Sequence, residues 1–264
     1  MRIGSLFSGI GGLEMGLLAA IPGSTVAWQA EAAEYPKAVL RARFPDVKLY
    51  DDVRLINETA ERVDIICGGF PCQDISNAGK RAGITGEKSG LWSEYVRILR
   101  ALRPRYVFVE NVSALVIRGL DRVLCDLAEL GYDAEWATLY AANVGAPHRR
   151  RRLFILAYAN GELLREQHGR VAGGNKQNPA GAGNDGPPWI VADANCAWEL
   201  QPGGVEREQW RWSAHGDRWA FESPVCGVAH GVPARKHRLT ALGNAVVPQQ
   251  AAYAWKALIE RTRT

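Results

Sequence analysis

The stretch VDIICGGFPCQDIS, residues 63–76, joins a short apolar segment to a sharp turn. The apolar segment is long enough for a buried strand and too short for a helix, and the Gly-Gly and Pro after it end the strand. Cys72 therefore follows the carboxyl end of a predicted parallel strand, where open α/β sheets bind their ligands. Cys67 fits the common role of a small buried residue, whereas polar and turn-forming residues surround Cys72.

Other apolar runs alternate with segments of helical periodicity along the chain. This alternation predicts an α/β fold with a doubly wound, Rossmann-like, mostly parallel sheet. The expected strands cover residues 2–7, 25–30, 63–67, 105–109, 132–140 and 153–157, and the expected helices cover residues 13–20, 34–43, 91–102, 120–130 and 249–261.

Composition narrows the class of protein. The 264 residues are 47% hydrophobic and 23% charged, as in ordinary globular proteins, and no apolar run approaches the roughly 18 residues of a membrane helix. Five cysteines, an odd number without regular spacing, predict reduced thiols and a cytoplasmic protein, and no metal-ligand spacing is present. The net charge of +4 is compatible with a polyanionic partner but does not establish one.

The composition changes in the second half of the chain. From about residue 158 to 233 glycine, asparagine and proline dominate, and five of the nine tryptophans fall there. We therefore expect a catalytic domain at residues 1–157, a small irregular inserted domain at 158–233, and a return segment at 234–264 that completes the first domain and brings the final helix against the first strand. Most of the five tryptophans can equally be explained as the core of that small insert.

A glycine-rich turn, FSGIGG at residues 7–12, joins the first expected strand to the first helix. Glycine lets a cofactor approach the backbone closely, although tight packing alone explains such a turn equally well. The order of the glycines differs from the usual dinucleotide pattern, which argues against NAD. Glu31 follows the second strand, at the spacing where an acid accepts a ribose hydroxyl, or else lies in a solvated loop.

Five motifs occur in a characteristic order. GGFPCQDIS at residues 68–76 resembles the nucleophile loop of the DNA cytosine-5 methyltransferases, and FSGIGG resembles the first motif of that family. ENV at 110–112, HRRRR at 148–152 and GNAV at 243–246 match later motifs, with histidine in place of the family's glutamine at 148. The resemblance covers about two thirds of the chain and implies the fold of methyltransferases that depend on S-adenosylmethionine.

The resemblance implies S-adenosylmethionine as the cofactor. Phe7 is expected to pack on the adenine, Glu31 to accept the ribose hydroxyls, Asp52 to meet the adenine amino group with Val53 against the ring, and Asn244 to lie near the methionine moiety. The full expected set of cofactor-binding residues is Phe7, Ser8, Gly9, Gly11, Gly12, Leu13, Glu31, Asp52, Val53, Gly69, Pro71, Leu91, Asn244, Ala245 and Val246.

The resemblance also assigns catalytic roles. Cys72 is the expected nucleophile, because a thiolate adds to cytosine C6 and can later leave. Glu110 would supply or share a proton at N3; without Cys72, an acid paired with an arginine at a strand end would explain this residue as well. Arg152 would hold the cytosine O2, and Arg150 would serve a phosphate or the scaffold.

The expected activity is methylation of cytosine C5 in double-stranded DNA at a short motif, through base flipping and a covalent intermediate. The resemblance suggests a methyltransferase of the restriction-modification kind, while the sequence leaves a prophage or housekeeping role open, and we expect a monomer. An RNA substrate is the nearest alternative, since the same motif order occurs in a branch of the family that acts on tRNA. A silent DNA-binding protein is a third possibility, which the intact Cys72, Glu110 and Arg152 disfavour. Thymidylate synthase also uses a cysteine at pyrimidine C6, but the glycine turn does not suit it.

Overall fold

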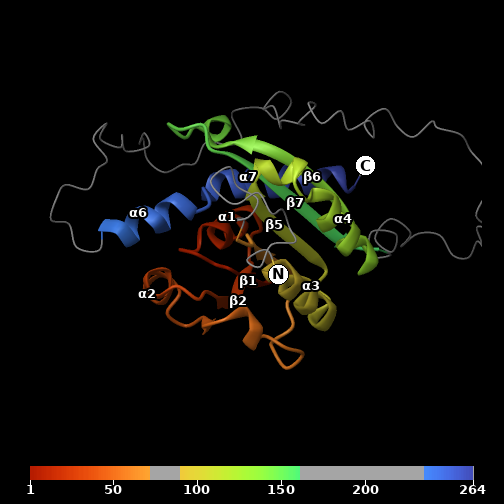
Figure 1. The fold of residues 1–264 in the computed structure, drawn as a ribbon, viewed down its shortest axis with the longest axis horizontal. Coiled ribbons are helices and arrows are strands. Elements are labelled where there is room, and N and C mark those ends of the chain that lie inside the picture. The colour runs from red at the N-terminus through yellow and green to blue at the C-terminus, as the bar shows by residue number, and fades with distance from the viewer. Residues whose placement is uncertain (72–89, 161–234, 264) are drawn as a thin grey trace, which may run out of the picture.

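The computed structural model describes residues 1–71, 90–160 and 235–263. In these ranges seven strands form one sheet in the order β3-β2-β1-β4-β5-β7-β6. Figure 1 labels β2, β1, β5, β7 and β6 of this sheet. The first five strands pair in parallel, and β7 runs antiparallel between β5 and β6. The predicted doubly wound, mostly parallel α/β sheet is confirmed. The strands are β1 (Arg2–Leu6), β2 (Thr25–Ala30), β3 (Lys48–Tyr50), β4 (Ile65–Gly68), β5 (Tyr106–Val112), β6 (Tyr132–Tyr140) and β7 (Arg151–Ala159).

Helices cover both faces of the sheet. The apolar sides of α3 and α4 pack into one buried cluster, and those of α1 and α7 pack into another on the opposite face (Figure 1). The helices of the described ranges are α1 (Gly12–Ala20), α2 (Glu34–Arg43), α3 (Leu91–Leu102), α4 (Leu120–Glu129), α6 (Arg235–Asn244) and α7 (Pro248–Arg261), with 3₁₀ turns η1 (Val53–Leu55), η3 (Ser113–Ile117) and η4 (Ala141–Val144).

Strand β5 shows how the sequence divides the core between the two faces. Val107 and Val109 belong to the cluster under α3 and α4, whereas Tyr106 and Phe108 belong to the cluster under α1 and α7. Successive side chains of a strand point to opposite faces, so a strand buried on both sides is apolar throughout. The same period places Glu110 on the α1–α7 face of the sheet.

Several element boundaries differ from the prediction. Strand β5 continues through Val112 and β7 begins at Arg151, so residues expected just outside the sheet belong to it. The apolar pattern predicts neither the three-residue strand β3 nor helix α6. The closing helix α7 packs chiefly on α1, with further contacts to β6 and β7, rather than on the first strand as expected.

The predicted insert at residues 158–233 lies almost wholly outside the described residues, so its boundaries stay a prediction. The return segment is described from residue 235 onward and packs on the first domain through α7. Within the described ranges, none of the helices combines the length and apolar character needed to cross a membrane.

Candidate functional site

The predicted cofactor and catalytic residues meet at one edge of the sheet. Five expected residues lie close to the carboxyl ends of the five parallel strands. In the order of those strands in the sheet they are Asp52 after β3, Glu31 after β2, Phe7 after β1, Gly69 after β4 and Glu110 near the end of β5. The direction of strand order reverses between β1 and β4, and ligands of open α/β sheets bind at such a switch point. Five residues far apart in the sequence therefore share one cleft.

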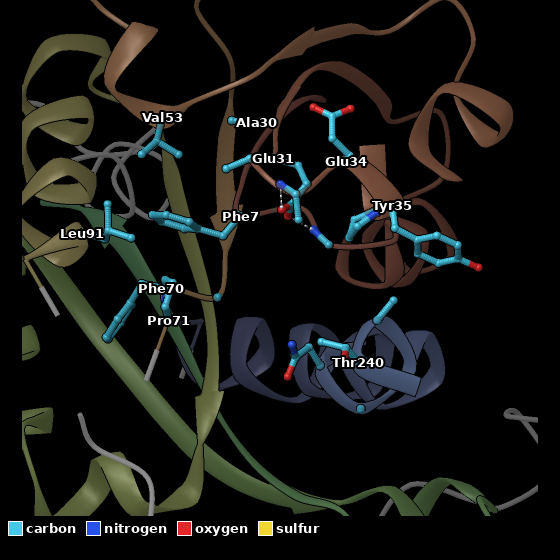
Figure 2. Close-up of a pocket in the computed structure, with 18 of the residues that line it drawn as sticks. Phe7, Ala30, Glu31, Glu34, Tyr35, Val53, Phe70, Pro71, Leu91 and Thr240 are labelled. Carbon is cyan, nitrogen blue, oxygen red and sulfur yellow. Dashed lines mark hydrogen bonds between the residues drawn. The ribbon is translucent and has the colours of Figure 1, made fainter. Parts of the chain in front are cut away.

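A cavity of about 1250 Å³ opens at this edge, between the strand ends, α2 and α6 (Figure 2). A second cavity of about 50 Å³ lies under the glycine turn. The expected residues that line the larger cavity are Phe7, Gly9, Glu31, Asp52, Val53, Gly69, Pro71, Leu91, Glu110, Arg152 and Asn244. Those that line only the smaller one are Ser8, Gly12, Leu13, Ala245 and Val246.

The carboxylate of Glu31 ties the glycine turn to the end of β2. Its Oε2 accepts a hydrogen bond of 2.8 Å from the Gly9 amide, and its Oε1 accepts one of 2.8 Å from the Ala33 amide. Phe7 and Gly9 both have left-handed backbone angles, with φ of 54° and 55°. Glu31 therefore holds the glycine turn in place, and it also lines the cavity where it is expected to accept the ribose hydroxyls.

The return segment after α6 presses directly on the start of α1. A Cβ atom added to Gly12 would lie 2.3 Å from the carbonyl oxygen of Val246, a distance that no side chain can occupy. Asn244, Ala245 and Val246 line the smaller cavity together with Gly9 and Gly12. The absence of a side chain at Gly12 thus lets two distant segments form one wall.

A Gly12→Ala substitution is expected to lower the stability by about 1–3 kcal/mol, because the added methyl group meets a backbone atom that cannot rotate away. Binding of S-adenosylhomocysteine, the expected cofactor without its transferable methyl group, should weaken as well, since the displaced segment lines the smaller cavity. Gly243→Ala is the matched control, because its Cβ would meet nothing within 4 Å. Thermal unfolding and calorimetric titration measure both effects, and equal melting temperatures for Gly12→Ala and the wild type would contradict the close approach.

Asp52 and Val53 form the far wall of the larger cavity. Asp52 caps η1 by accepting a 2.8 Å hydrogen bond from the Arg54 amide, and Val53 is buried. Arg97 on α3 donates to the carbonyls of Ile56 (2.8 Å) and Val53 (3.3 Å), which anchors this turn to the helix. Figure 2 shows Val53, Phe7 and Leu91 around one end of the cavity, as expected for residues that enclose a flat ring.

Glu110 and Arg152 form an ion pair at the cleft. Arg152 Nε lies 3.0 Å from Glu110 Oε1, and both side chains are largely buried and line the larger cavity. Glu110 is directly opposite Phe154 in the β5–β7 register, so Arg152, two residues away, occupies the diagonal position on the same face. The sheet register therefore brings together two groups that lie 42 residues apart in sequence.

Burial raises the pKa of the Glu110 carboxyl above its ordinary value, while Arg152 and then Arg150 partly offset this effect. Gly69, at the end of β4, leaves room for this carboxyl, because a Cβ there would lie 3.0 Å from Glu110 Oε2. An acid of this kind keeps a proton closer to neutral pH than an exposed glutamate does. It is suited to share a proton with a bound ligand.

Arg150 lies near these residues but lines neither cavity. Its guanidinium donates to two backbone carbonyls of the return segment, those of Gly243 and Ala245. Of the two roles that the sequence leaves open for this residue, the contacts favour the scaffold.

Glu14 is a buried acid beneath the glycine turn that the sequence motifs did not single out. Its Oε1 accepts a 3.0 Å hydrogen bond from Gln29 Nε2, and its Oε2 has no hydrogen-bond partner among the described residues. Burial raises the pKa of the Glu14 carboxyl, and hydrogen bonds from Ser5 and Gln29 offset this only in part. Burial and then the charge of Glu14 raise the pKa of the buried Cys67 thiol well above its normal value.

Glu14 should make the folding stability depend on pH. The pKa of Glu14 is higher in the folded protein than in the unfolded chain. Its contribution to the free energy of unfolding is therefore complete below the pKa of the unfolded state and is lost as the pH rises through the pKa of the folded state. Glu14→Gln should therefore melt at a higher temperature than the wild type in alkaline buffer and lose this part of the pH dependence. Thermal unfolding across a pH series tests this, with the exposed Glu129→Gln as control; parallel curves for Glu14→Gln and the wild type would refute it.

Some expected residues remain outside the site as described. Cys72 lies outside the described residues, which stop at Pro71 on the cavity wall and resume at residue 90. Gly11 caps α1 with φ of 86° and lines neither cavity, and His148 is exposed and also lines neither of them.

Other lining residues are absent from the prediction. Asn111 Nδ2 donates a hydrogen bond of 3.2 Å to the Phe70 carbonyl and so holds the loop before Cys72. Because Asn111 directly follows Glu110 in the sequence, its place at the site could have been predicted. Tyr35 and His237 face each other from α2 and α6 with ring centroids 6.2 Å apart. Because these two residues are far apart in the sequence, no local pattern predicts that their rings face each other.

Comparison with known proteins identifies relatives. A segment of 165 residues is 38% identical to the type II methyltransferase M2.BsuMI of Bacillus subtilis (strain 168), covering 60% of this chain and 42% of the relative. The type II methyltransferase M.CviJI of Paramecium bursaria Chlorella virus IL3A is 37% identical over 155 residues, covering 58% and 41%. The matched part of the chain thus spans less than half the length of these relatives.

Solved structures show the same fold. A variant of Spodoptera frugiperda DNMT2 superposes with a TM-score of 0.52 at 22% identity, over 61% of this chain and 50% of that one. Schizosaccharomyces pombe Dnmt2 gives a TM-score of 0.51 at 18% identity, over 66% and 57%. The family model for C-5 cytosine-specific DNA methylases matches residues 1–181, which is more than half of the chain. The chain belongs to the C-5 cytosine-specific DNA methylase family.

Proposed function

We propose that the protein methylates C5 of cytosine in double-stranded DNA at a short sequence motif. The observation that carries this proposal is the Glu110–Arg152 pair at 3.0 Å, which lines the same cavity as the expected cofactor residues and Pro71, the neighbour of Cys72. The named relatives are type II methyltransferases, and the motifs for a nucleophile, an acid and an oxygen-binding arginine all occur in this chain.

S-adenosylmethionine is the cofactor of this family, and the residues present fit it. The cleft offers an aromatic ring at Phe7, a carboxylate at Glu31 and an apolar wall at Val53 and Leu91, while Gly12 lets the backbone of the return segment approach closely. These groups match the needs of an adenosine with a short amino-acid tail. When bound, the cofactor supplies a methyl group on a positively charged sulfur.

The protein's own residues would activate the cytosine. Addition of the Cys72 thiolate to C6 removes the aromaticity of the ring and moves electron density toward C5, which is otherwise a poor nucleophile. Glu110, with its raised pKa, would give or share a proton at N3, so that charge does not build up on the ring. Arg152, held by Glu110, would donate to the O2 oxygen. After transfer, water takes the C5 proton, the C5–H electron pair re-forms the C5–C6 double bond, and the Cys72 thiolate leaves C6. The N3 proton returns to Glu110, which restores both the neutral base and the acid.

A cytosine inside a duplex cannot reach this cleft, because its C5 and C6 atoms are stacked between neighbouring bases. We therefore propose that the target base is flipped out of the helix into the part of the cavity lined by Glu110, Arg152 and Pro71. The predicted insert at residues 158–233 would read the flanking sequence. The predicted partition of the chain and the monomeric state are part of the same proposal.

The test incubates the full chain with methyl-labelled S-adenosylmethionine and a duplex of mixed sequence. Incorporated label measures methyl transfer, and bisulfite sequencing then maps the cytosines that resist conversion. Protection at one short recurring motif is the expected result, and it identifies the target at the same time. Cofactor binding without DNA methylation, followed by label in tRNA, would replace DNA with RNA as the substrate; no transfer to either would overturn the proposed activity.

A further inference from the structure

The Arg150 side chain connects the start of β7 to the end of α6. Arg150 Nη1 donates to the Gly243 carbonyl at 2.9 Å, and its Nη2 donates to the Ala245 carbonyl. These two carbonyls flank Asn244, the last residue of α6. A planar guanidinium with parallel donors can span two such oxygens, whereas a lysine ammonium offers a single point charge. The contact therefore depends on arginine specifically.

The backbone of Arg150 is also held on several sides. Its φ of 30° lies in the left-handed region that a side chain other than glycine seldom adopts. Its carbonyl accepts hydrogen bonds from the Ala141 amide (3.2 Å) and from Gln250 Nε2 (3.1 Å). A conformation of this kind persists only where the surroundings enforce it, and it often marks a functional region. Here it aims the side chain at the return segment.

The segment that Arg150 holds is the one that presses on the cofactor turn. Asn244 lines both cavities, and the Val246 carbonyl occupies the space that a side chain at Gly12 would need. Residues 243–246 are thus confined between Arg150 on one side and the glycine turn on the other. Loss of the Arg150 contact would free Asn244 to move away from the cleft.

The same geometry engages both terminal nitrogens of Arg150 within the protein. Two of the three guanidinium nitrogens donate to backbone carbonyls, and the buried Nε has no hydrogen-bond partner among the described residues. Arg149, its neighbour in the arginine run, is exposed. Burial lowers the pKa of Arg150, and the nearby Arg152 lowers it further, as for a cation partly withdrawn from water.

We propose that Arg150 is a positioning residue for the cofactor, which holds Asn244 against the glycine turn and touches neither the cytosine nor a DNA phosphate. Through it, the start of β7, which carries Arg152, is joined to the wall of the cofactor cleft. This inference rests on the proposed function, because it takes the cleft to be the S-adenosylmethionine site.

The test measures S-adenosylhomocysteine affinity by calorimetric titration of the full chain without DNA. Arg150→Lys keeps the charge but cannot bridge both carbonyls, so we expect its affinity to fall about tenfold, the equivalent of roughly one lost hydrogen bond. Arg149→Ala should bind like the wild type. Leu258→Ala, in the buried face of α7, is the control for lost stability alone, and it should melt lower with unchanged affinity.

A second measurement separates positioning from a phosphate contact. The slope of log affinity for DNA against log salt should be equal for Arg150→Ala and the wild type, whereas loss of one phosphate contact would reduce it by about 1. Unchanged cofactor affinity in both Arg150→Lys and Arg150→Ala would overturn the inference, as would a reduced salt slope. If the wild type itself binds no S-adenosylhomocysteine, the proposed function fails first.

Discussion

A Cys72→Ala chain is expected to lose methyl transfer entirely, by a factor of about a million, as when the nucleophile of a covalent catalyst is removed. Among the described residues that line the cleft, Glu110 and Arg152 cannot replace the thiolate, because they only stabilise charge on a ring that has already been attacked. Cofactor affinity should stay near that of the wild type. The measurement is transfer of labelled methyl groups to duplex DNA, together with S-adenosylhomocysteine titration.

Two other cysteines provide controls for this prediction. Cys125 is a free, exposed cysteine on α4, and Cys125→Ala should leave the rate unchanged. Cys67 is buried in β4, where burial and the neighbouring Glu14 raise the pKa of its thiol, so it stays protonated and unreactive. A duplex that carries 5-fluorocytosine should form an adduct with the wild type that survives denaturation, because fluorine cannot leave C5 as a proton does. An undiminished adduct with Cys72→Ala would refute the assignment.

The parts of this molecule that could be predicted from sequence are those in which the signal is local. Apolar runs and glycine turns placed the main strands and helices, and the carboxyl ends of parallel strands then bring Phe7, Glu31 and Glu110 to one edge. Residues at the ends of neighbouring parallel strands lie close together, so the positions of the strands along the chain also predict which residues form the site.

The contacts that escaped prediction join segments that are distant in sequence. Nothing in the arginine run indicates that the Arg150 side chain reaches the Gly243 and Ala245 carbonyls, and nothing near Gly12 indicates that Val246 presses on it. Strand β3 is three residues long and only partly buried at the sheet edge, so its alternation is too short to detect. Helix α6 has little apolar periodicity and therefore lacks the pattern that predicts a helix.

The Glu110–Arg152 pair shows why a motif can predict a residue and still miss how it is held. An acid that pairs with an arginine at a strand end was the ordinary structural explanation for Glu110, and the ion pair is present. The pairing does not compete with a catalytic role, because it keeps both side chains directed into the cavity that they line. Arg152 offsets only part of the effect of burial, so the Glu110 pKa remains raised.

Glu110→Gln is therefore expected to lower methyl transfer by about 10²–10⁴-fold, the usual contribution of a positioned acid or base. The substitution keeps the shape of the side chain and an oxygen near Arg152 but removes the titrating proton. Cofactor affinity should change little, because the acid is proposed to act on the cytosine. Glu129→Gln, at an exposed position on α4, is the matched control and should retain full activity.

The pH dependence gives the sign of the Glu110 effect. If Glu110 delivers a proton to N3, its contribution to the wild-type rate should fall as the pH rises through its raised pKa. Glu110→Gln should lack this decline, because its amide does not titrate in that range. A decline of equal size in both proteins would assign it to another group, and a rate for Glu110→Gln within twofold of the wild type would leave Glu110 with the structural role alone. Arg152 is proposed to donate to O2, a role separate from the proton at N3, so an Arg152→Lys chain should also lose rate while keeping the decline with pH.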